Sequence, residues 1–226
     1  MKKITLGLIH TSATMVPIFK ELCRAKLPEI ETFDLVDDSL IRDVIRAGKL
    51  TESIAQRVAM MIFQAEKAGA DQVLVTCSSI GRAVETASHL CSVPVLRVDL
   101  PLADRAVQMG KTIGVIATLR TTMDPTTDLI DRRAEVAGKS IRVVPRLCEG
   151  AFETLMNGDP EGHDQMVAEA LRELADEVDV VLLAQASMAR VVAGFKPGEI
   201  RVPVLGSPPI AIEYLANELN NVYQKG

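Results

Sequence analysis

The chain has 226 residues, 48% hydrophobic and 24% charged, which is enough apolar material for the core of one large or two small α/β domains. A net charge of −5 with no basic run argues against nucleic-acid binding, and a chain without tryptophan offers few aromatic rings for stacking on bases or sugars. No apolar run reaches the ~20 residues that span a bilayer, so we expect no membrane segment.

The cysteines and histidines predict neither disulfides nor a metal site. The four cysteines show no close pairing and no metal-ligand spacing, and the three histidines are scattered. Two lysines near the N-terminus precede a short apolar stretch, but His10 and Thr11 interrupt it and no small-residue cleavage site follows. The stretch therefore predicts a core strand, and free thiols in a chain without a leader indicate the cytoplasm.

Short apolar runs alternate with longer stretches of helical periodicity, a pattern typical of parallel βαβ units. The clearest helix runs from Thr51, a capping residue, to Lys67, and Gly69 follows its end. A loop at 158–160 precedes a second long helix, expected at about 165–177. The predicted strands are Lys3–His10, Ile30–Val36, Gln72–Thr76, Val95–Val98, Thr112–Ala117, Arg142–Val144, Val180–Ala184 and Val202–Leu205.

Three blocks of the sequence recur at nearly one offset. DQVLVTCSSIGRAV, from Asp71, aligns with DVVLLAQASMARVV, from Asp179, with six of fourteen positions identical at an offset of 108. LGLIHT, ending at Thr11, resembles IGVIAT, ending at Thr118, at an offset of 107, and VPVL recurs at an offset of 109. Converging βαβ units would reproduce the hydrophobic pattern but not this spacing, so the chain is predicted to be a duplication.

The duplication predicts an α/β fold of two pseudosymmetric parallel-sheet domains with the active site between them. We expect the first half to cover residues 1–94 plus 207–226 and the second to cover 99–204. Parallel sheets bind ligands at the carboxyl ends of their strands. In the repeat, Cys77 of the first half is equivalent to Gln185 of the second, and Thr11 is equivalent to Thr118.

Cys77 is the strongest candidate for chemistry. It ends a strand and precedes a helix expected near Ser79, where the helix dipole would lower the pKa of its thiol. Free backbone N–H groups in that turn, with the Ser78 and Ser79 hydroxyls, suit a carboxylate. A small buried cysteine is the alternative, but the polar run from Thr76 to Ser79 favours function.

The second half offers a similar polar run. TLRTT, from Thr118 to Thr122, follows a strand, and its hydroxyls and amides either hold an anionic group or cap a helix. His10 is equally compatible with a cleft-facing side chain and a packed one. Cys23 and Cys91 are interpreted as packing residues.

Three further positions are less informative from the sequence. Cys148 and Glu149 follow a strand, so either side chain is a secondary candidate for reaching the cleft. His163 is expected in a polar loop, exposed to solvent. The roles of Arg82 and Arg190, which recur in the repeat, stay open.

The motifs VLVTCSSIG, GVIATLRTT and LLAQASMA resemble the first cysteine motif, the carboxylate-binding threonine motif and the second cysteine motif of the Asp/Glu/hydantoin racemase superfamily, in the family's order. The resemblance implies two pseudosymmetric α/β domains and chemistry that needs neither pyridoxal phosphate nor metal, so no cofactor is expected. It also implies two cysteines that act on opposite faces of the substrate carbon. Cys77 matches the first, but Gln185 stands at the second, and an amide cannot exchange a proton at ordinary pH.

Three interpretations stay open. The first is an isomerase or racemase in which Cys77 works with Ser187, His10, Glu149 or Cys148. The second is a single-cysteine lyase of the arylmalonate decarboxylase kind, and the third is a binding protein without catalysis. In each, the partner is a small-molecule carboxylate, with no nucleic acid or membrane, and self-association is left open. Catalytic roles are assigned to Cys77, Gln185 and Ser187, and substrate contacts to His10, Thr11, Thr76, Ser78, Ser79, Thr118, Thr121 and Thr122.

Overall fold

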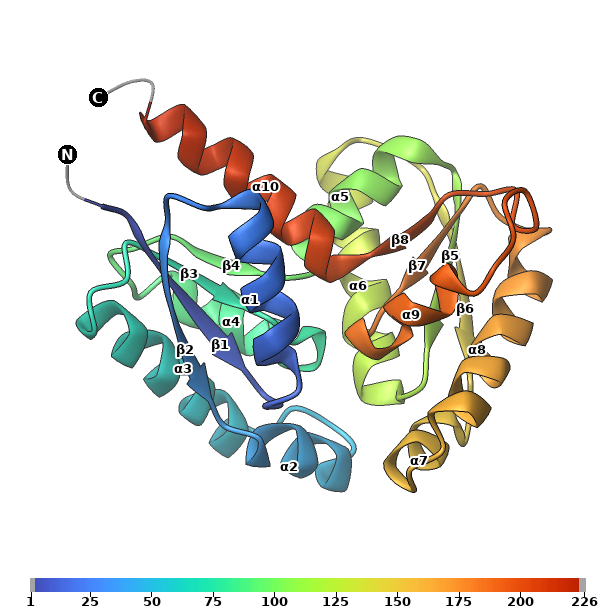
Figure 1. Ribbon diagram of the computed structural model, residues 1–226, viewed down its shortest axis with the longest axis horizontal. Helices are drawn as coiled ribbons and strands as arrows, with labels where there is room; N and C mark the ends of the chain where they lie inside the picture. The colour runs from blue at the N-terminus through green and yellow to red at the C-terminus, as the bar shows by residue number, and fades with distance from the viewer. Residues whose placement is uncertain (1–2, 224–226) are drawn as a thin grey trace. The chain divides into compact units, whose positions relative to one another are not determined.

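The computed structural model describes residues 3–223, and its chain divides into two compact units. Unit 1 comprises Met1–Leu100 and Pro208–Gly226, and unit 2 comprises Pro101–Ser207. Each unit contains one four-stranded parallel sheet with helices packed on it, so the predicted α/β class with two parallel sheets is confirmed (Figure 1).

The sheet of unit 1 has the strand order β2-β1-β3-β4, and every neighbouring pair is parallel. Crossover helices join these strands, as parallel pairing requires. The strands are β1 (Thr5–His10), β2 (Glu31–Val36), β3 (Gln72–Val75) and β4 (Val95–Arg97), and the helices are α1 (Met15–Lys26), α2 (Ser39–Ala47), α3 (Glu52–Lys67), the 3₁₀ turn η1 (Ser78–Ile80), α4 (Gly81–Ser88) and α10 (Ser207–Tyr223).

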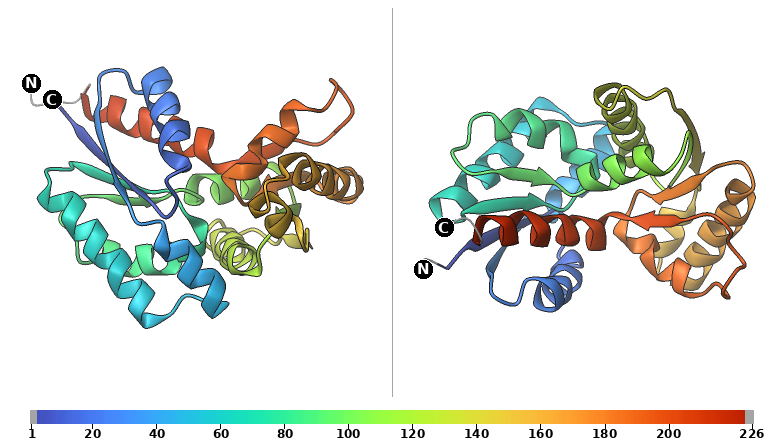
Figure 2. Two further views of the ribbon diagram at one scale, coloured as in Figure 1. Left: turned by 60° about the horizontal axis from the view of Figure 1, so that its bottom comes forward. Right: turned by 90° about the horizontal axis from the view of Figure 1, so that it is seen from above.

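Both faces of this sheet are buried, because successive strand residues point to opposite sides. Leu8 and Leu74 pack against α1 and α10, whereas Ile9, Val73 and Val75 pack against α2, α3 and α4. Figures 1 and 2 show α10, in red, running beside the blue elements from the start of the chain, so the two ends of the sequence share one core.

The sheet of unit 2 repeats this order as β6-β5-β7-β8. Helix α8 packs on β5 and β7, and α6 packs on β5 and β6 from the other side (Figure 1). The strands are β5 (Thr112–Ala117), β6 (Arg142–Leu147), β7 (Val180–Leu183) and β8 (Val204–Gly206), and the helices are α5 (Leu100–Met109), α6 (Arg120–Val136), α7 (Ala151–Met156), α8 (Pro160–Ala175), η2 (Ala186–Met188) and α9 (Ala189–Ala193).

The hydrogen bonds of the two sheets match residue by residue. Thr76 N–H donates to the Ile9 carbonyl at 3.0 Å, and Ala184 N–H donates to the Ile116 carbonyl at 2.9 Å. The residues that follow these two donors, Cys77 and Gln185, therefore occupy the same place in the fold.

A second matching pair lies at the opposite edge of the sheets. The Asp71 carboxylate accepts from Thr5 N–H at 3.0 Å, and the Asp179 carboxylate accepts from Thr112 N–H at 2.8 Å. These aspartates are identical in the repeat because both sheets need an acceptor for the first N–H of the central strand.

Three local predictions are corrected. Strand β6 continues to Leu147, three residues past its predicted end, because an edge strand tolerates the missing N–H of Pro145. Helix α8 begins at Pro160 rather than near 165, with the Asp159 carboxylate accepting from Gly162 N–H at 2.8 Å. His163 consequently lies on the inner face of α8 and is fully buried, not exposed in a loop.

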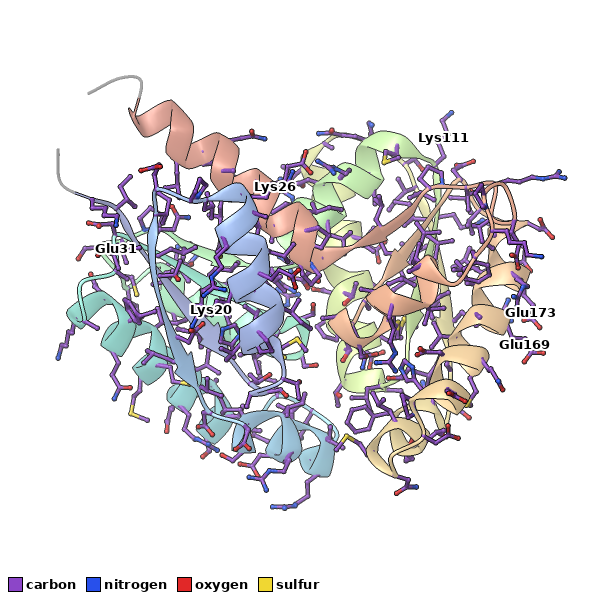
Figure 3. The ribbon with its side chains drawn as sticks, in the orientation of Figure 1. Lys20, Lys26, Glu31, Lys111, Glu169 and Glu173 are labelled. Carbon is purple, nitrogen blue, oxygen red and sulfur yellow. The ribbon has the colours of Figure 1, made fainter. Side chains whose placement is uncertain are left out.

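Charged side chains mark outer surfaces of both units (Figure 3). Lys20 and Lys26 project from α1, and Glu169 and Glu173, one helical turn apart, project from α8. Lys111 lies at the amino end of β5, the edge opposite to Thr118. Within residues 3–223, none of the helices combines the length and the hydropathy needed to cross a membrane.

Candidate active site

Cys77 lies at the carboxyl edge of the first sheet, directly after β3. Its backbone is extended, with φ −130° and ψ 119°, and it immediately precedes η1. Its sulfur is hydrogen-bonded by the Thr11 side chain, by the Ser79 N–H and hydroxyl, and by the Ile80 N–H. These donors converge on one atom, an arrangement that stabilises sulfur most when it carries negative charge.

Burial raises the pKa of the Cys77 thiol above its ordinary value, although the hydrogen bonds from Thr11, Ser79 and Ile80 oppose this effect. This corrects the expectation of a lowered pKa, because desolvation outweighs the turn's N–H groups. Cys77 is therefore a protonated thiol at neutral pH. Hydrogen bonds from these donors stabilise a thiolate more than a thiol.

His10 and Thr76 form a buried network behind Cys77. His10 is fully buried, with Nε2 3.0 Å from Asp34 Oδ1 and Nδ1 2.9 Å from Thr76 Oγ1. Burial lowers the pKa of His10 despite the neighbouring Asp34, so the ring is neutral. We assign the proton to Nε2, which donates to the carboxylate, and the single hydrogen of the Thr76 hydroxyl is shared between Nδ1 and the Ile9 carbonyl oxygen, 3.1 Å away. The ring thus supports the residue next to Cys77 and offers no free nitrogen to a ligand.

The two serines that follow Cys77 are more buried than Cys77 itself. Ser78 is 6% exposed and Ser79 is 5% exposed. The Ser79 hydroxyl is hydrogen-bonded to the Cys77 sulfur, so it stabilises this thiol. Contact of either serine with a substrate stays a prediction.

Gln185 occupies the matching place in unit 2. Its backbone is also extended, with φ −131° and ψ 140°, and it precedes η2. Its Oε1 accepts from the Thr118 N–H at 2.6 Å and from the Thr118 hydroxyl at 3.0 Å. Thr118 thus binds Gln185 as Thr11 binds Cys77. Because Oε1 is occupied, the amide presents its N–H₂ group, which donates hydrogen bonds but does not relay protons.

The first turn of α6 follows Thr118 and contains two further predicted contacts. Thr122 is 3% exposed. Thr121 Oγ1 is also buried, and among the described residues it has no hydrogen-bond partner. A buried hydroxyl without a partner is unfavourable, so this atom suits a ligand oxygen or a water molecule. Ser187 lies in η2 and is partly exposed.

The other side chains that the sequence offered as acids or bases are Cys148 and Glu149. Cys148 follows β6, is 7% exposed, and burial raises the pKa of its thiol to about 11. Glu149 is an exposed side chain 3.7 Å from Arg120. In the part of the chain that the structure covers, no three His, Cys, Asp or Glu side chains are grouped to hold a metal ion.

The remaining two cysteines lie in packed surroundings. Cys23 is 3% exposed within the core formed by α1 and α10, and burial raises the pKa of its thiol to about 11. Cys91 packs at the edge of the other core of unit 1, with its sulfur 3.5 Å from the Ala87 carbonyl oxygen.

These observations define a class: a duplicated parallel α/β protein in which one repeat holds a hydrogen-bonded thiol and the other holds an amide at the same position. A family model described as "Asp/Glu/Hydantoin racemase" matches residues 6–215. The chain therefore belongs to the Asp/Glu/hydantoin racemase family, as its motifs predicted.

Individual relatives agree with this family. A glutamate racemase from Trichodesmium erythraeum (strain IMS101) is 32% identical over 114 residues, which cover 50% of this chain and 41% of that protein. The match thus spans less than half of the relative's length. Among solved structures, glutamate racemase RacE1 from Bacillus anthracis is 19% identical with a TM-score of 0.77, covering 98% of this chain and 84% of that one. Allantoin racemase from Klebsiella pneumoniae is 18% identical with a TM-score of 0.66, covering 97% and 89%. At these identities the two structures show the shared fold.

Proposed function

We propose that the protein is an isomerase-type enzyme that acts at the α-carbon of a small carboxylate, with Cys77 as its acid/base. The observation that carries this proposal is the set of donors on the Cys77 sulfur from Thr11, Ser79 and Ile80. A thiol held only for packing does not need them. A thiol that gives up and regains a proton during turnover does, because they stabilise the thiolate.

In the proposed reaction, Cys77 first releases its proton to solvent; the thiolate then removes the α-proton of the substrate, and the thiol so formed returns a proton to the same carbon. The carbanion that forms is stabilised as an enediolate by hydrogen-bond donors. The Gln185 N–H₂ group and the Thr121 hydroxyl are the proposed donors, since neither has its hydrogen-bonding capacity filled. The proposal requires no metal ion and no organic cofactor.

Gln185 makes this chemistry one-sided. A racemase of the two-thiol kind needs a second group that exchanges protons, and a primary amide does not do so at ordinary pH. The same observation favours a second candidate, a single-cysteine lyase. In that reaction decarboxylation leaves the carbanion, and Cys77 alone protonates it.

The named activities of the relatives guide the choice of substrates. Glutamate, aspartate and allantoin are the first compounds to test, because proteins of similar sequence or structure are described as racemases for them. Small α-substituted malonates test the lyase.

The experiment is a screen of these compounds in D₂O with the purified protein. NMR follows deuterium at the α-carbon, and headspace analysis follows carbon dioxide. Exchange supports the isomerase-type reaction, and carbon dioxide release supports the lyase. Binding without either signal for every compound would contradict an enzymatic function.

A further inference from the structure

Arg97, at the end of β4, is a charged side chain inside unit 1. It is 3% exposed, and its partner Asp99 is 1% exposed. Its Nε and Nη2 each donate to one Asp99 carboxylate oxygen at 2.7 Å, and Nη1 donates to Glu85 of α4 at 2.5 Å. Three of the guanidinium nitrogens are therefore held, so the planar group has one fixed position.

The guanidinium lies directly against Gly81, the first residue of α4. A Cβ built on Gly81 would overlap Cζ, Nε and Nη2 of Arg97. The Gly81 backbone has φ −56° and ψ −35°, an ordinary helical conformation open to any residue. Glycine is thus required here by the space that Arg97 fills, not by its backbone conformation.

Gly81 immediately follows η1, whose N–H groups bind the thiol. The Ser79 and Ile80 N–H groups that donate to Cys77 are two residues and one residue before Gly81, respectively. A surface that fixes Gly81 consequently fixes the direction of both N–H groups.

Unit 2 shows that the turn itself does not need an arginine. By strand register, Gly206 of β8 is the equivalent of Arg97, and Ala189 of α9 is the equivalent of Gly81. The second repeat thus has the Ala189 methyl group where the first has Gly81. It nevertheless forms the same extended residue, Gln185, followed by a 3₁₀ turn. Burying a charged group is costly, so the arginine belongs to the repeat with the thiol for a reason other than folding of the turn.

We propose that Arg97 is a positioning residue for Cys77: held by Asp99 and Glu85, its guanidinium supports Gly81 and so aims the Ser79 and Ile80 N–H groups at the sulfur. This inference rests on the proposed role of Cys77. Arg97 acts through the turn and does not contact the substrate.

The test measures the thiol directly, by the rate at which iodoacetamide alkylates Cys77 between pH 6 and pH 10, read by mass spectrometry of its peptide. Arg97→Lys keeps the charge but loses the planar fork. We expect it to slow alkylation at pH 8 by about tenfold, with the pH–rate profile moved to higher pH, while circular dichroism is unchanged. Arg133→Lys, which alters an arginine–aspartate pair with Asp104 in unit 2, is the matched control and should react like the wild type.

Glu85→Gln weakens the ion pair between Glu85 and Arg97, at a partly exposed position. It should move the pH–rate profile of alkylation in the same direction by a smaller amount. If Arg97→Lys does not fold, the Glu85→Gln variant tests the proposal instead, and a wild-type profile in that variant would overturn it. A folded Arg97→Lys variant with the wild-type profile would overturn the proposal, as would an equal shift in Arg133→Lys. Failure of the proposed function looks different: Cys77 would be alkylated as expected, but no acid would exchange its α-proton.

Discussion

The carboxyl edges of the two sheets share one backbone plan but carry different side chains. Where the fold needs a residue, both repeats keep it, as with the capping carboxylates of Asp71 and Asp179. Around the thiol the repeats diverge, and four polar or charged residues of unit 1 correspond to small or apolar residues of unit 2. The pairs are His10 and Ala117, Asp34 and Pro145, Thr76 and Ala184, and Arg97 and Gly206.

This difference teaches where the chemistry lies. A buried polar network is retained only when each member is hydrogen-bonded, and unit 1 maintains two such networks beside Cys77. Unit 2 keeps only the link from Thr118 to Gln185. Under the proposed function, unit 1 would supply the acid/base and unit 2 the binding groups, and the following experiments test that division.

The largest effect is expected for Cys77→Ala. Loss of the acid/base should reduce α-proton exchange by about 10²–10⁴-fold, the usual contribution of such a group. Cys91→Ala, which removes a thiol at the edge of the core, is the control and should retain most activity. Equal activity of both variants would remove Cys77 from the mechanism.

Gln185→Cys should break the asymmetry. A second thiol at the matching position adds an acid/base to the binding side, so the variant should gain racemisation, measured by polarimetry with deuterium uptake. Gln185→Ser is the matched control and should gain none. The gain is limited by the pKa of the new thiol, since among the described residues Thr118 is the one that is hydrogen-bonded to the Gln185 side chain. Racemisation by the serine variant would argue against a role for the new thiol.

Thr11→Val and Thr118→Val compare the two repeats directly, because each removes the threonine hydroxyl from one of two equivalent pairs. These pairs are Thr11 with Cys77 and Thr118 with Gln185. Thr11→Val deletes a donor to the Cys77 sulfur, so the pKa of this thiol should rise and its alkylation at pH 8 should slow by about tenfold. Thr118→Val leaves the backbone N–H bond to Gln185, so it should weaken substrate binding by only a few-fold and leave alkylation unchanged. The same change in alkylation for both variants would contradict separate roles.

The smallest effect concerns His10 and stability. Burial lowers the pKa of His10 from 6.5, so below pH 6.5 the unfolded chain takes up a proton that the folded chain does not. This group's contribution to stability is therefore full above pH 6.5 and is lost as the pH falls below it. His10→Gln should be less stable than the wild type at pH 7.5, and the gap should narrow by on the order of 1 kcal/mol at pH 5. Urea unfolding at the two pH values measures this, and His89→Gln, at an exposed position, should show no change in the gap.

The sequence predicted the parts of the fold that depend on periodicity and repetition. All eight strands were found, because buried parallel strands are continuous apolar runs, and the offset of 108 correctly paired Cys77 with Gln185. The start of α8 was missed because Pro160 was interpreted as part of a loop, although proline is favoured in the first turn of a helix.

The surroundings of the site were harder to predict. Nothing in the spacing shows that Arg97 contacts Gly81, because sixteen residues separate them and only the packing of β4 against α4 joins them. An arginine within the apolar run of β4 was the available signal. The raised pKa of Cys77 was also missed, since the degree of burial depends on the folded surroundings rather than on the local motif.

The central claim, that protons move on the Cys77 side alone, is tested most directly by the stereochemistry of exchange in the wild type. Each enantiomer of a substrate identified by the screen is incubated in D₂O, and its deuterium content and optical rotation are followed together. We expect that one enantiomer exchanges its α-proton with retention, that the other does not exchange, and that the optical rotation stays constant. If both enantiomers instead converge on a racemate, and Cys77→Ala stops this, a second residue supplies protons from the opposite face and the one-sided account is wrong.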